Sequence, residues 1–412
     1  MTNWSSCRFC QAPLTEPFLD LGMSPLSNAY LRAEQLNHGE TFFPLKTFVC
    51  DSCFLVQLEA FVSPADIFSD YAYFSSYSES WLQHAETYSN RMACELALDA
   101  NSLVVEVASN DGYLLQFFKA QQIPVLGIEP ARNVAEVAQR KEIPTVVEFF
   151  GENLAHELSA TRGKADLLLG NNVLAHVPDI RDFISGLRVL LKPRGIITME
   201  FPHLLKLMEQ NQFDTIYHEH FSYLSLNTTS RMFASQGLQI FDVEELPTHG
   251  GSLRIHACHD TDTGNVITSR FKSLLNAEQR AGLENLEGYS DFANRVAKTK
   301  FELLEFLITA KKQGKNIAAY GAAAKGNTLL NYCGIGPEFI DYVVDRSPHK
   351  QGLFLPGSHI PIYPVEHIDV TRPDYLLILP WNLAEEICTD IARIRQWGGR
   401  FVISIPEVKV LP

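Results

Sequence analysis

The sequence predicts an α/β protein built on doubly wound, mostly parallel sheets, with a small metal-binding module near its N-terminus. Three observations predict this architecture. Apolar strands alternate with helices between residues 100 and 200, a second alternation follows residue 316, and four cysteines form two close pairs before residue 54. A length of 412 residues fits two or three domains. We expect them to span residues 1–70, 71–265 and 266–412.

The amino-acid composition and net charge argue against nucleic-acid and membrane partners. Hydrophobic residues make up 46% of the chain and charged residues 20%, the balance of a soluble globular protein. The formal net charge is −14, and the sequence shows no clustered basic segment of the kind that nucleic-acid binding requires. No apolar stretch approaches the roughly 18 residues of a membrane span, and the first residues do not resemble a secretory signal. We therefore expect a cytoplasmic enzyme that acts on a small molecule, without nucleic-acid or membrane partners.

The four N-terminal cysteines form two C-x-x-C pairs, Cys7/Cys10 and Cys50/Cys53. A two-residue gap lets both sulfurs of a pair face one ion, and two pairs complete a tetrahedral zinc site. Because four thiolates leave no position for water or substrate, the single zinc ion should be structural. A redox C-x-x-C is the alternative, but the pairs lack the strand–helix setting of that motif. The gap between the pairs should contain a loop or a short helix.

Five strands are expected in the middle of the chain, each a short apolar run that ends at a turn. They cover residues 103–108, 125–129, 145–149, 166–170 and 195–200. Because helices alternate with these strands through short turns, we expect one doubly wound sheet whose ligand lies at the carboxyl ends of the strands. Two further runs, 238–246 and 252–258, are expected to form an antiparallel hairpin.

The turn after the first strand indicates which ligand this sheet binds. A dinucleotide-binding turn reads G-x-G-x-x-G, whereas residues 106–112 contain a single glycine, so a pyrophosphate is poorly accommodated. Glu129 ends the second strand and can accept hydrogen bonds from two ribose hydroxyls, while Glu106 and Asp111 add negative potential suited to a sulfonium. This combination favours S-adenosylmethionine (SAM) over NAD or FAD. The residues expected to bind SAM are Glu106, Ala108, Asn110, Gly112, Glu129, Pro130, Asn171 and Asn172.

A polar segment that begins at Tyr217 is dense in groups that can move protons. If the segment is extended, His218 and His220 share one face, and Tyr217 and Glu219 share the other. General acid–base catalysis is the favoured interpretation, because imidazole titrates near neutrality and a neighbouring Tyr or Glu can orient it or stabilise an enolate. A histidine metal pair and a merely structural cluster are the alternatives. His176 follows the fourth strand, where the reactive end of the cofactor would point.

Three other features offer groups for a substrate. The glycine turn that contains His249 and Arg254 suits an anionic or polyhydroxylated ligand, unless it is only the turn of the hairpin. A second glycine turn, after the expected strand 316–320, opens a helix at Lys325 and favours a phosphate, with a purely structural domain as the alternative. Tyr71 and Tyr73 belong to an aromatic tract that either covers the site or packs in a core.

These motifs occur together in a known order. The double C-x-x-C start and the turn at 106–112 are followed by Asn171-Asn-Val-Leu-Ala-His-Val177, Tyr217-His-Glu-His220, His249-Gly-Gly-Ser252-Leu-Arg254 and Gly321-Ala-Ala-Ala-Lys325-Gly-Asn-Thr328. In this series, over nearly its whole length, the chain resembles SAM-dependent sugar C-methyltransferases that act on nucleotide-linked deoxy-keto-hexoses. Ala108 is a departure, because many methyltransferases have glycine in this turn.

The resemblance implies a zinc-binding domain, a central class I methyltransferase domain with a Rossmann-like sheet, and a second Rossmann-like domain at the C-terminal end. It implies a nucleotide-linked, dTDP-type 4-keto-deoxyhexose as the substrate, with Lys325 near its diphosphate. It also implies that His220 is the base that removes the proton next to the ketone. The other side chains implied to line the sugar site are Tyr217, Glu219, His176 and one of Tyr71 and Tyr73.

Three rival functions follow from the residues alone. A zinc-ribbon methyltransferase acting on nucleic acid would need a basic face. A non-catalytic zinc-dependent binding module with a vestigial SAM pocket is disfavoured by the combination of Tyr217, Glu219 and His220. An NAD-dependent oxidoreductase is disfavoured because the glycine fingerprint is missing.

Overall fold

The computed structural model describes residues 6–62 and 75–411. The chain folds into two compact units that alternate along the sequence. Unit 1 comprises Met1–Thr15, Cys50–His203 and Phe221–Leu286, and unit 2 comprises Glu16–Val49, Leu204–His220 and Glu287–Pro412. The segment that contains Tyr217, Glu219 and His220 therefore belongs to unit 2.

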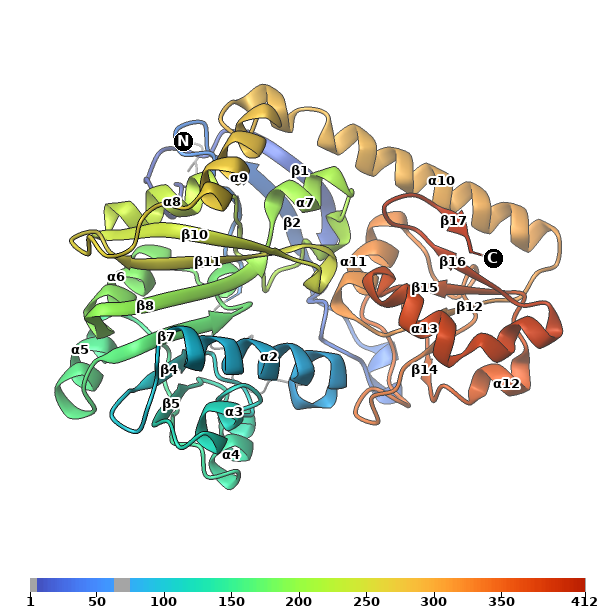
Figure 1. The fold of residues 1–412 in the computed structure, drawn as a ribbon. Coiled ribbons are helices and arrows are strands. Elements are labelled where there is room, and N and C mark those ends of the chain that lie inside the picture. The colour runs from blue at the N-terminus through green and yellow to red at the C-terminus, as the bar shows by residue number, and fades with distance from the viewer. Residues whose placement is uncertain (1–5, 63–74, 412) are drawn as a thin grey trace. The chain divides into compact units, whose positions relative to one another are not determined.

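A seven-stranded sheet forms the centre of unit 1 (Figure 1). The strand order is β6-β5-β4-β7-β8-β11-β10; β11 is antiparallel to both of its neighbours, and the first five strands are parallel. Its strands are β4 (Val104–Val107), β5 (Val125–Ile128), β6 (Thr145–Val146), β7 (Ala165–Asn171), β8 (Leu191–Pro202), β10 (Leu238–Leu246) and β11 (Ser252–His259). The strands β3 (Val56–Leu58) and β9 (Ser222–Tyr223) also pair antiparallel to each other.

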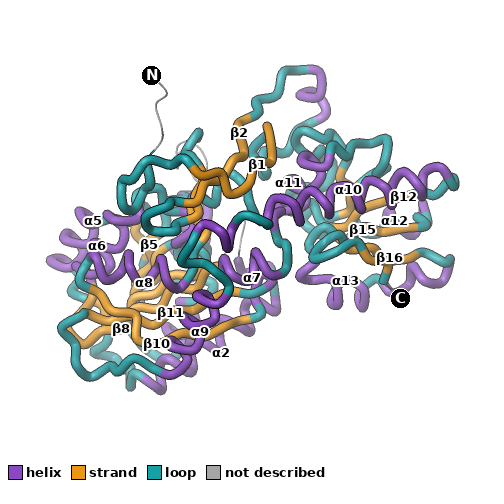
Figure 2. Tube along the Cα trace, turned by 90° about the horizontal axis from the view of Figure 1, so that it is seen from above, coloured by secondary structure: helices purple, strands orange, loops and turns teal. Residues whose placement is uncertain are grey.

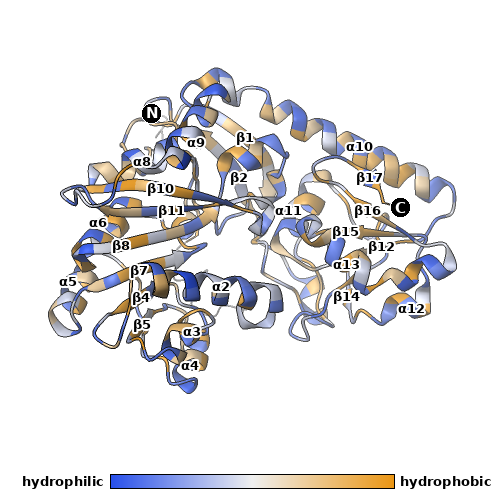
Figure 3. Cartoon of the chain, viewed as in Figure 1, coloured by the Kyte–Doolittle hydropathy of each residue, from blue (hydrophilic) through white to orange (hydrophobic). Residues whose placement is uncertain are grey.

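Helices pack against this sheet. They are α2 (Glu79–Glu95), α3 (Leu115–Ala120), α4 (Arg132–Arg140), α5 (Glu152–Thr161), α6 (Ile180–Leu190), α8 (Leu226–Ser235) and α9 (Ser269–Arg280). Met92 of α2 and Phe118 of α3 are fully buried in one core with Val104 and Leu167 of the sheet, and Figure 3 shows the apolar character of the central strands. Burial of these apolar side chains is the main force that holds the layers together.

Side-chain caps fix where several of these helices begin. Ser78, Asp179, Ser225 and Thr268 each accept a hydrogen bond from the backbone N–H three residues further along. Such a cap satisfies one of the N–H groups that a helix leaves unpaired at its start, and it contributes about 1 kcal/mol.

Unit 2 contains a six-stranded sheet with the order β14-β13-β12-β15-β16-β17, in which only β17 is antiparallel. Figure 2 labels three of these strands, β12, β15 and β16. Its strands are β12 (Ile317–Tyr320), β13 (Val343–Val344), β14 (Ile362–Tyr363), β15 (Tyr375–Ile378), β16 (Arg400–Ile403) and β17 (Lys409–Val410). Its helices are α7 (Leu204–Glu209), α10 (Phe292–Lys312), α11 (Ala324–Cys333), α12 (His367–Thr371) and α13 (Ala384–Asp390). Unit 2 also contains the antiparallel hairpin of β1 (Glu16–Ser24) and β2 (Phe43–Val49).

The expected α/β fold class is confirmed, with the five middle strands and the hairpin of β10 and β11 close to their expected positions. The third strand is shorter than expected, since β6 ends at Val146 rather than at residue 149. A loop or a short helix was expected between the cysteine pairs; the structure has a short 3-10 helix, Ala33–Asn37, but also the strands β1 and β2. Two register shifts in β1 break its alternation of apolar and polar residues, so the sequence pattern did not reveal this strand. Among the described residues, none of the helices combines the length and apolarity needed to cross a membrane.

Candidate active site

The expected cofactor residues meet at one edge of the sheet of unit 1. β4 pairs with β5 on one side and with β7 on the other, so the chain reverses its direction of winding at β4. In open α/β sheets, ligands bind at such a switch point, outside the carboxyl ends of the strands. The turn after β4, Glu129 and Pro130 after β5, and Asn171 and Asn172 at the end of β7 all lie at this edge.

The turn after β4 has an unusual backbone. Ala108, Asn110 and Gly112 have φ values of 56°, 49° and 76°, in the left-handed region that favours glycine. A Cβ atom added to Gly112 would come within 2.4 Å of the Cδ1 atom of Ile143, so the buried Ile143 side chain would have to shift to accept it. At Ala108 the backbone has the conformation that glycine adopts most easily, which explains why glycine is common at this position in similar turns.

Three carboxyl groups cluster at this turn. Glu106 is fully buried, and burial together with the charges of Glu129 and Asp111 raises its pKa well above its usual value. Glu129 accepts hydrogen bonds from the backbone N–H groups of Asn110 at 3.0 Å and Ala131 at 2.8 Å, yet burial still raises its pKa. Lys141 pairs with Asp111 at 3.4 Å, but the charged groups that act on Glu106 are the other two carboxyls, so the chain itself does not balance a negative charge at Glu106. A cationic ligand such as SAM would neutralise it, so the donor set fits this cofactor.

An aromatic group lies beside the cofactor edge. The side-chain amide of Asn171 donates to the Tyr113 hydroxyl at 3.2 Å, and the Tyr113 ring stacks on Trp81 with 5.9 Å between centroids. Trp81 also stacks on His84 at 4.9 Å and meets His249 edge to face at 5.3 Å. His249 is therefore near the residues predicted to bind SAM. Trp81 ends the aromatic tract that was expected either to cover the site or to pack in a core. His84 was not predicted, because helical spacing on α2 does not distinguish it from a core position.

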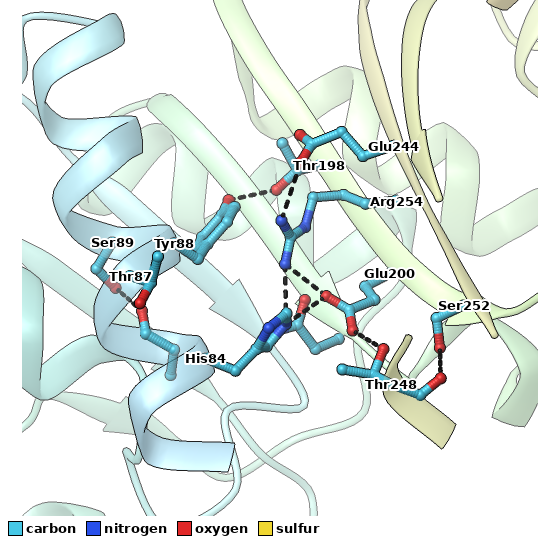
Figure 4. Close-up of polar contacts among 12 residues, drawn as sticks. His84, Thr87, Tyr88, Ser89, Thr198, Glu200, Glu244, Thr248, Ser252 and Arg254 are labelled. Atoms are coloured by element: carbon cyan, nitrogen blue, oxygen red, sulfur yellow. Dashed lines mark hydrogen bonds and ion pairs between the residues drawn. The ribbon is translucent and has the colours of Figure 1, made fainter. Parts of the chain in front are cut away.

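A charged network surrounds Glu200 of β8 (Figure 4). The carboxylate of Glu200 accepts hydrogen bonds from Arg254 at 2.6 Å, from Thr248 at 2.8 Å and from the Nε2 atom of His84 at 2.9 Å. Arg254 is 3% exposed and lies 3.6 Å from Glu244, so two carboxylates already bind its guanidinium. Its predicted role in substrate binding stays a prediction, and an anionic ligand would have to compete with both carboxylates.

This network holds Glu200 in its charged form. Burial alone would raise the pKa of Glu200, but the hydrogen bond from His84 and the charge of Arg254 lower it to about 2. The backbone carbonyl of Glu200 accepts a hydrogen bond of 2.7 Å from the N–H of Asn172. The network is therefore joined directly to the loop that follows β7.

In unit 2, the segment from Tyr217 to His220 forms a turn and not the extended strand considered above. The N–H of His220 donates to the Tyr217 carbonyl at 2.9 Å, and the two rings lie 4.1 Å apart. The alternation of faces expected for an extended segment is therefore wrong. His218 is directed elsewhere, with its Nε2 atom 3.2 Å from the Pro44 carbonyl oxygen and its ring 5.9 Å from the ring of Phe43.

The contacts of His220 and Glu219 define their proton-transfer properties. The Nδ1 atom of His220 lies 2.9 Å from the Thr215 carbonyl oxygen, which can only accept, so Nδ1 carries the hydrogen. In the neutral ring, the lone pair is then on Nε2, the atom that can act as a base. Glu219 accepts a hydrogen bond of 2.5 Å from the Asn28 side chain, and burial raises the pKa of Glu219 to about 7.

Lys325 lies at the start of α11, as predicted. Its ammonium donates to the Asn382 side chain at 2.6 Å and stands 4.7 Å from the centre of the Trp381 ring. Trp381 in turn donates from its indole N–H to Asp214 at 2.8 Å, and burial raises the pKa of Asp214 to about 7 although the charge of Lys325 opposes this shift. Burial lowers the pKa of Lys325. Asp214 was not predicted, since it comes to Lys325 from a distant part of the sequence.

The four N-terminal cysteines come together as predicted. All four sulfur atoms lie within 4.8 Å of one another, with 3.5 Å between those of Cys7 and Cys53 and 3.4 Å between those of Cys10 and Cys50. A Zn–S distance of about 2.3 Å separates the sulfurs of a tetrahedral site by roughly 3.8 Å, so the cluster fits one zinc ion. Among the described residues it is the group found suitable for a metal, and the histidine pair at 218 and 220 does not form another. Tyr71 and Tyr73 lie outside the described residues.

Comparisons with known families agree with this arrangement. Residues 7–68 match the family model of a zinc binding domain, residues 82–243 that of a methyltransferase domain, and residues 247–406 that of a C-methyltransferase C-terminal domain. The C-methyltransferase NovU of Streptomyces niveus is 36% identical over 405 residues, which cover 98% of this chain and 96% of NovU.

The chain belongs to the C-methyltransferase family. It is a SAM-dependent methyltransferase with a zinc-binding domain. Solved structures similar to parts of it include a SAM-dependent methyltransferase from Clostridium acetobutylicum, with a TM-score of 0.36, 11% identity, and coverage of 43% of this chain and 92% of that one. Another is the magnesium protoporphyrin IX methyltransferase of Synechocystis, with a TM-score of 0.34, 15% identity, and coverage of 43% and 83%.

Proposed function

We propose that this enzyme methylates the carbon next to the ketone of a nucleotide-linked 4-keto-deoxyhexose, with dTDP as the nucleotide, in a cytoplasmic pathway of deoxysugar biosynthesis. Family membership and the ordered series of motifs support this substrate class. The observation that carries the proposal is the contact of His220 with the Thr215 carbonyl oxygen. It leaves the Nε2 atom of His220 as the base, in a ring that lies 4.1 Å from the ring of Tyr217.

The reaction needs such a base. A carbon next to a ketone becomes nucleophilic only after it loses a proton, and we assign this step to the Nε2 atom of His220. The ketone oxygen then gains negative charge, which a positioned donor can stabilise. Because the pKa of Glu219 is raised to about 7, its carboxyl group is partly protonated at neutral pH and can donate a hydrogen bond, as can the Tyr217 hydroxyl. His176 would contribute a further polar contact to the sugar.

The proposed cofactor and nucleotide sites use the remaining predicted residues. SAM supplies an electrophilic methyl group when bound. Glu129 would accept the ribose hydroxyls and the carboxyl groups of Glu106 and Asp111 would balance the positive charge. In unit 2, Lys325 at the N-terminal end of α11 would bind the diphosphate of the substrate, since free N–H groups and a cation both favour an anion there.

The proposal can be tested with a panel of nucleotide-linked 4-keto-deoxyhexoses. The enzyme should add one methyl group to at least one of them in the presence of SAM, detected by mass, and NMR should place the methyl next to the ketone. Without SAM, the enzyme should exchange the proton at this carbon with deuterium from D2O, since deprotonation precedes methylation. A panel without methylation or exchange would contradict the proposed substrate class.

The His220→Asn variant tests the assignment of the base. We expect both methylation and deuterium exchange to fall by about 10²–10⁴-fold, the usual contribution of a general base, while SAM binding measured by calorimetry persists. His156→Asn is the matched control, because His156 is exposed on α5. Full exchange activity in the His220→Asn variant would show that another group removes the proton.

A further inference from the structure

Arg8 occupies a central position in unit 1, although it lies between two of the cysteines that fit the zinc site. Its guanidinium donates one hydrogen bond of 3.0 Å to the Pro178 carbonyl oxygen and another to the carbonyl oxygen of Leu58. It also lies over the ring of Phe221, with 5.4 Å to the ring centre. An arginine guanidinium stays protonated in proteins, so the side chain is charged. A partly buried cation that binds two backbone carbonyls holds those two segments of chain in a fixed position.

The backbone of Arg8 is coupled to the zinc ligands. Its N–H donates to the side-chain oxygen of Gln57 at 2.9 Å, and the side-chain nitrogen of the same Gln57 donates to the sulfur of Cys7 at 3.2 Å. Gln57 is 1% exposed, so water does not compete for these bonds. The conformation of the first cysteine pair therefore sets the position of the Arg8 backbone, from which its side chain extends.

The guanidinium end of Arg8 reaches the segment that contains His176. Pro178 follows His176 by two residues and precedes Asp179, the N-cap of α6. The same segment is bound from another side, since the Ala175 carbonyl accepts a hydrogen bond of 2.8 Å from the N–H of Phe221. Arg8 therefore contacts the His176 segment at Pro178 and also contacts Phe221, the residue that binds the same segment at Ala175.

We propose that Arg8 is a positioning residue that couples zinc binding at the four cysteines to the conformation of the His176 segment. With zinc bound, the first cysteine pair holds Arg8 so that its guanidinium binds Pro178 and Leu58 together. Without zinc, the backbone of the pair loses its restraint and Arg8 no longer holds residues 173–178. The effect of this coupling on catalysis rests on the proposed function, in which His176 contacts the sugar.

The test uses hydrogen–deuterium exchange of the peptide 173–178 in the full-length, zinc-loaded enzyme. Arg8→Met keeps an apolar stem of similar length but removes both hydrogen bonds, and Arg8→Lys keeps the charge without the planar fork that binds two carbonyls. Arg162→Met is the matched control, because Arg162 is exposed at the end of α5. Zinc content and SAM affinity are measured on each variant to confirm that the rest of unit 1 is intact.

We expect amide exchange in this peptide to become at least about tenfold faster in Arg8→Met, less so in Arg8→Lys, and to stay unchanged in the control. Removal of zinc from the wild-type enzyme with a chelator should accelerate the same amides. In Arg8→Met, chelation should add little, because the connection is already broken. Equal acceleration by chelation in wild type and Arg8→Met would overturn the proposal, as would wild-type exchange in Arg8→Met.

Kinetics separate this proposal from the proposed function. If His176 contacts the sugar, the Arg8→Met variant should lose roughly 10- to 100-fold in kcat or in kcat/KM for the sugar, while its affinity for SAM is unchanged. Faster exchange without any change in sugar kinetics would support the coupling through Arg8 but would contradict the role of His176 in the proposed function. Unchanged exchange with reduced kinetics would contradict the coupling without contradicting the role of His176 in the proposed function.

Discussion

Two clusters of acidic residues in unit 1 differ in how their charge is balanced. In the cluster around Glu200, Arg254, His84 and Thr248 bind the carboxylate, and its pKa is lowered to about 2. In the cluster around Glu106, the nearest charges are the carboxylates of Glu129 and Asp111, and the pKa of Glu106 is raised. Glu106 and Glu200 are both fully buried on strands of one sheet.

The difference indicates which cluster serves structure and which serves binding. A buried carboxylate is costly unless a cation or several donors compensate it. The Glu200 cluster is compensated by the chain itself, so it can stabilise the fold without a ligand. In the Glu106 cluster, Lys141 pairs with Asp111, but Glu106 itself is acted on by carboxylates, and a bound cation would compensate it. A protein that keeps such a cluster loses some stability, a cost that binding of SAM can offset.

The largest expected effect is on the compensated cluster. Arg254→Met should lower the free energy of unfolding by about 3–5 kcal/mol, because it leaves Glu200 as a buried charge without its cation. Urea denaturation would measure the loss. The double variant Arg254→Met/Glu200→Gln should be less destabilised than Arg254→Met alone, since it removes the uncompensated charge as well. If the two losses simply add, the ion pair does not account for the effect.

The second prediction concerns the uncompensated cluster. Glu106→Gln removes a negative charge and should weaken SAM binding by about 10- to 100-fold, equivalent to roughly 1.4–2.8 kcal/mol. S-adenosylhomocysteine lacks the sulfonium charge, so its affinity should fall less. Calorimetry with both ligands checks this difference, and Glu136→Gln on the exposed face of α4 is the control. An equal loss for both ligands would show that charge balance is not the role of Glu106.

The stability of Glu106→Gln completes the comparison. Because an amide needs no counter-charge, the ligand-free variant should be as stable as the wild type or more stable, in contrast to Arg254→Met. Urea denaturation of both variants under one set of conditions shows whether each substitution raises or lowers the free energy of unfolding. Marked destabilisation of Glu106→Gln would show that Glu106, like Glu200, stabilises the fold.

The pH dependence of stability should differ in sign between the clusters. The folded-state pKa of Glu200 is about 2, below its usual value of 4.5, so its contribution is present above pH 4.5 and is lost as the pH falls toward 2. The pKa of Glu106 is raised, so the ligand-free protein binds more protons there than the unfolded chain and loses stability as the pH rises above 4.5. Thermal unfolding measured from acidic to neutral pH checks both the loss of stability at low pH and the loss as the pH rises above 4.5. The Glu106→Gln variant should remove only the loss above pH 4.5.

The same contrast explains how much the sequence could predict. The strands of unit 1 were predictable because short apolar runs ending at turns are local patterns, and Glu106 and Glu129 were found because they end or follow such runs. Arg254 was predicted as a free cation for a ligand, whereas Glu200, which binds it, is 54 residues away in the chain. Pairing over that distance depends on the register of β8 and β11, which no local pattern specifies.

The Tyr217 segment shows a second limit. Its residue types predicted a proton-transfer cluster, but the turn that brings Tyr217 and His220 together depends on one backbone hydrogen bond with no sequence signature. Asn28, which binds Glu219, comes from the gap between the cysteine pairs. Residue identity thus predicted the candidate groups, and the contact with the Thr215 carbonyl decides which nitrogen of His220 carries the hydrogen.

The smallest expected effect concerns the backbone at the uncompensated cluster. Ala108 has a φ of 56°, which costs a non-glycine residue roughly 1–2 kcal/mol. Ala108→Gly should relieve this strain, but glycine also gives the unfolded chain about 0.4–1 kcal/mol more entropy, so the net gain in stability should be below about 1 kcal/mol. Gly112→Ala in the same turn should instead destabilise, because its Cβ would come within 2.4 Å of Ile143. If Ala108→Gly proves destabilising in urea, the turn after β4 is not strained, and the Glu106 cluster differs from the Glu200 cluster in charge alone.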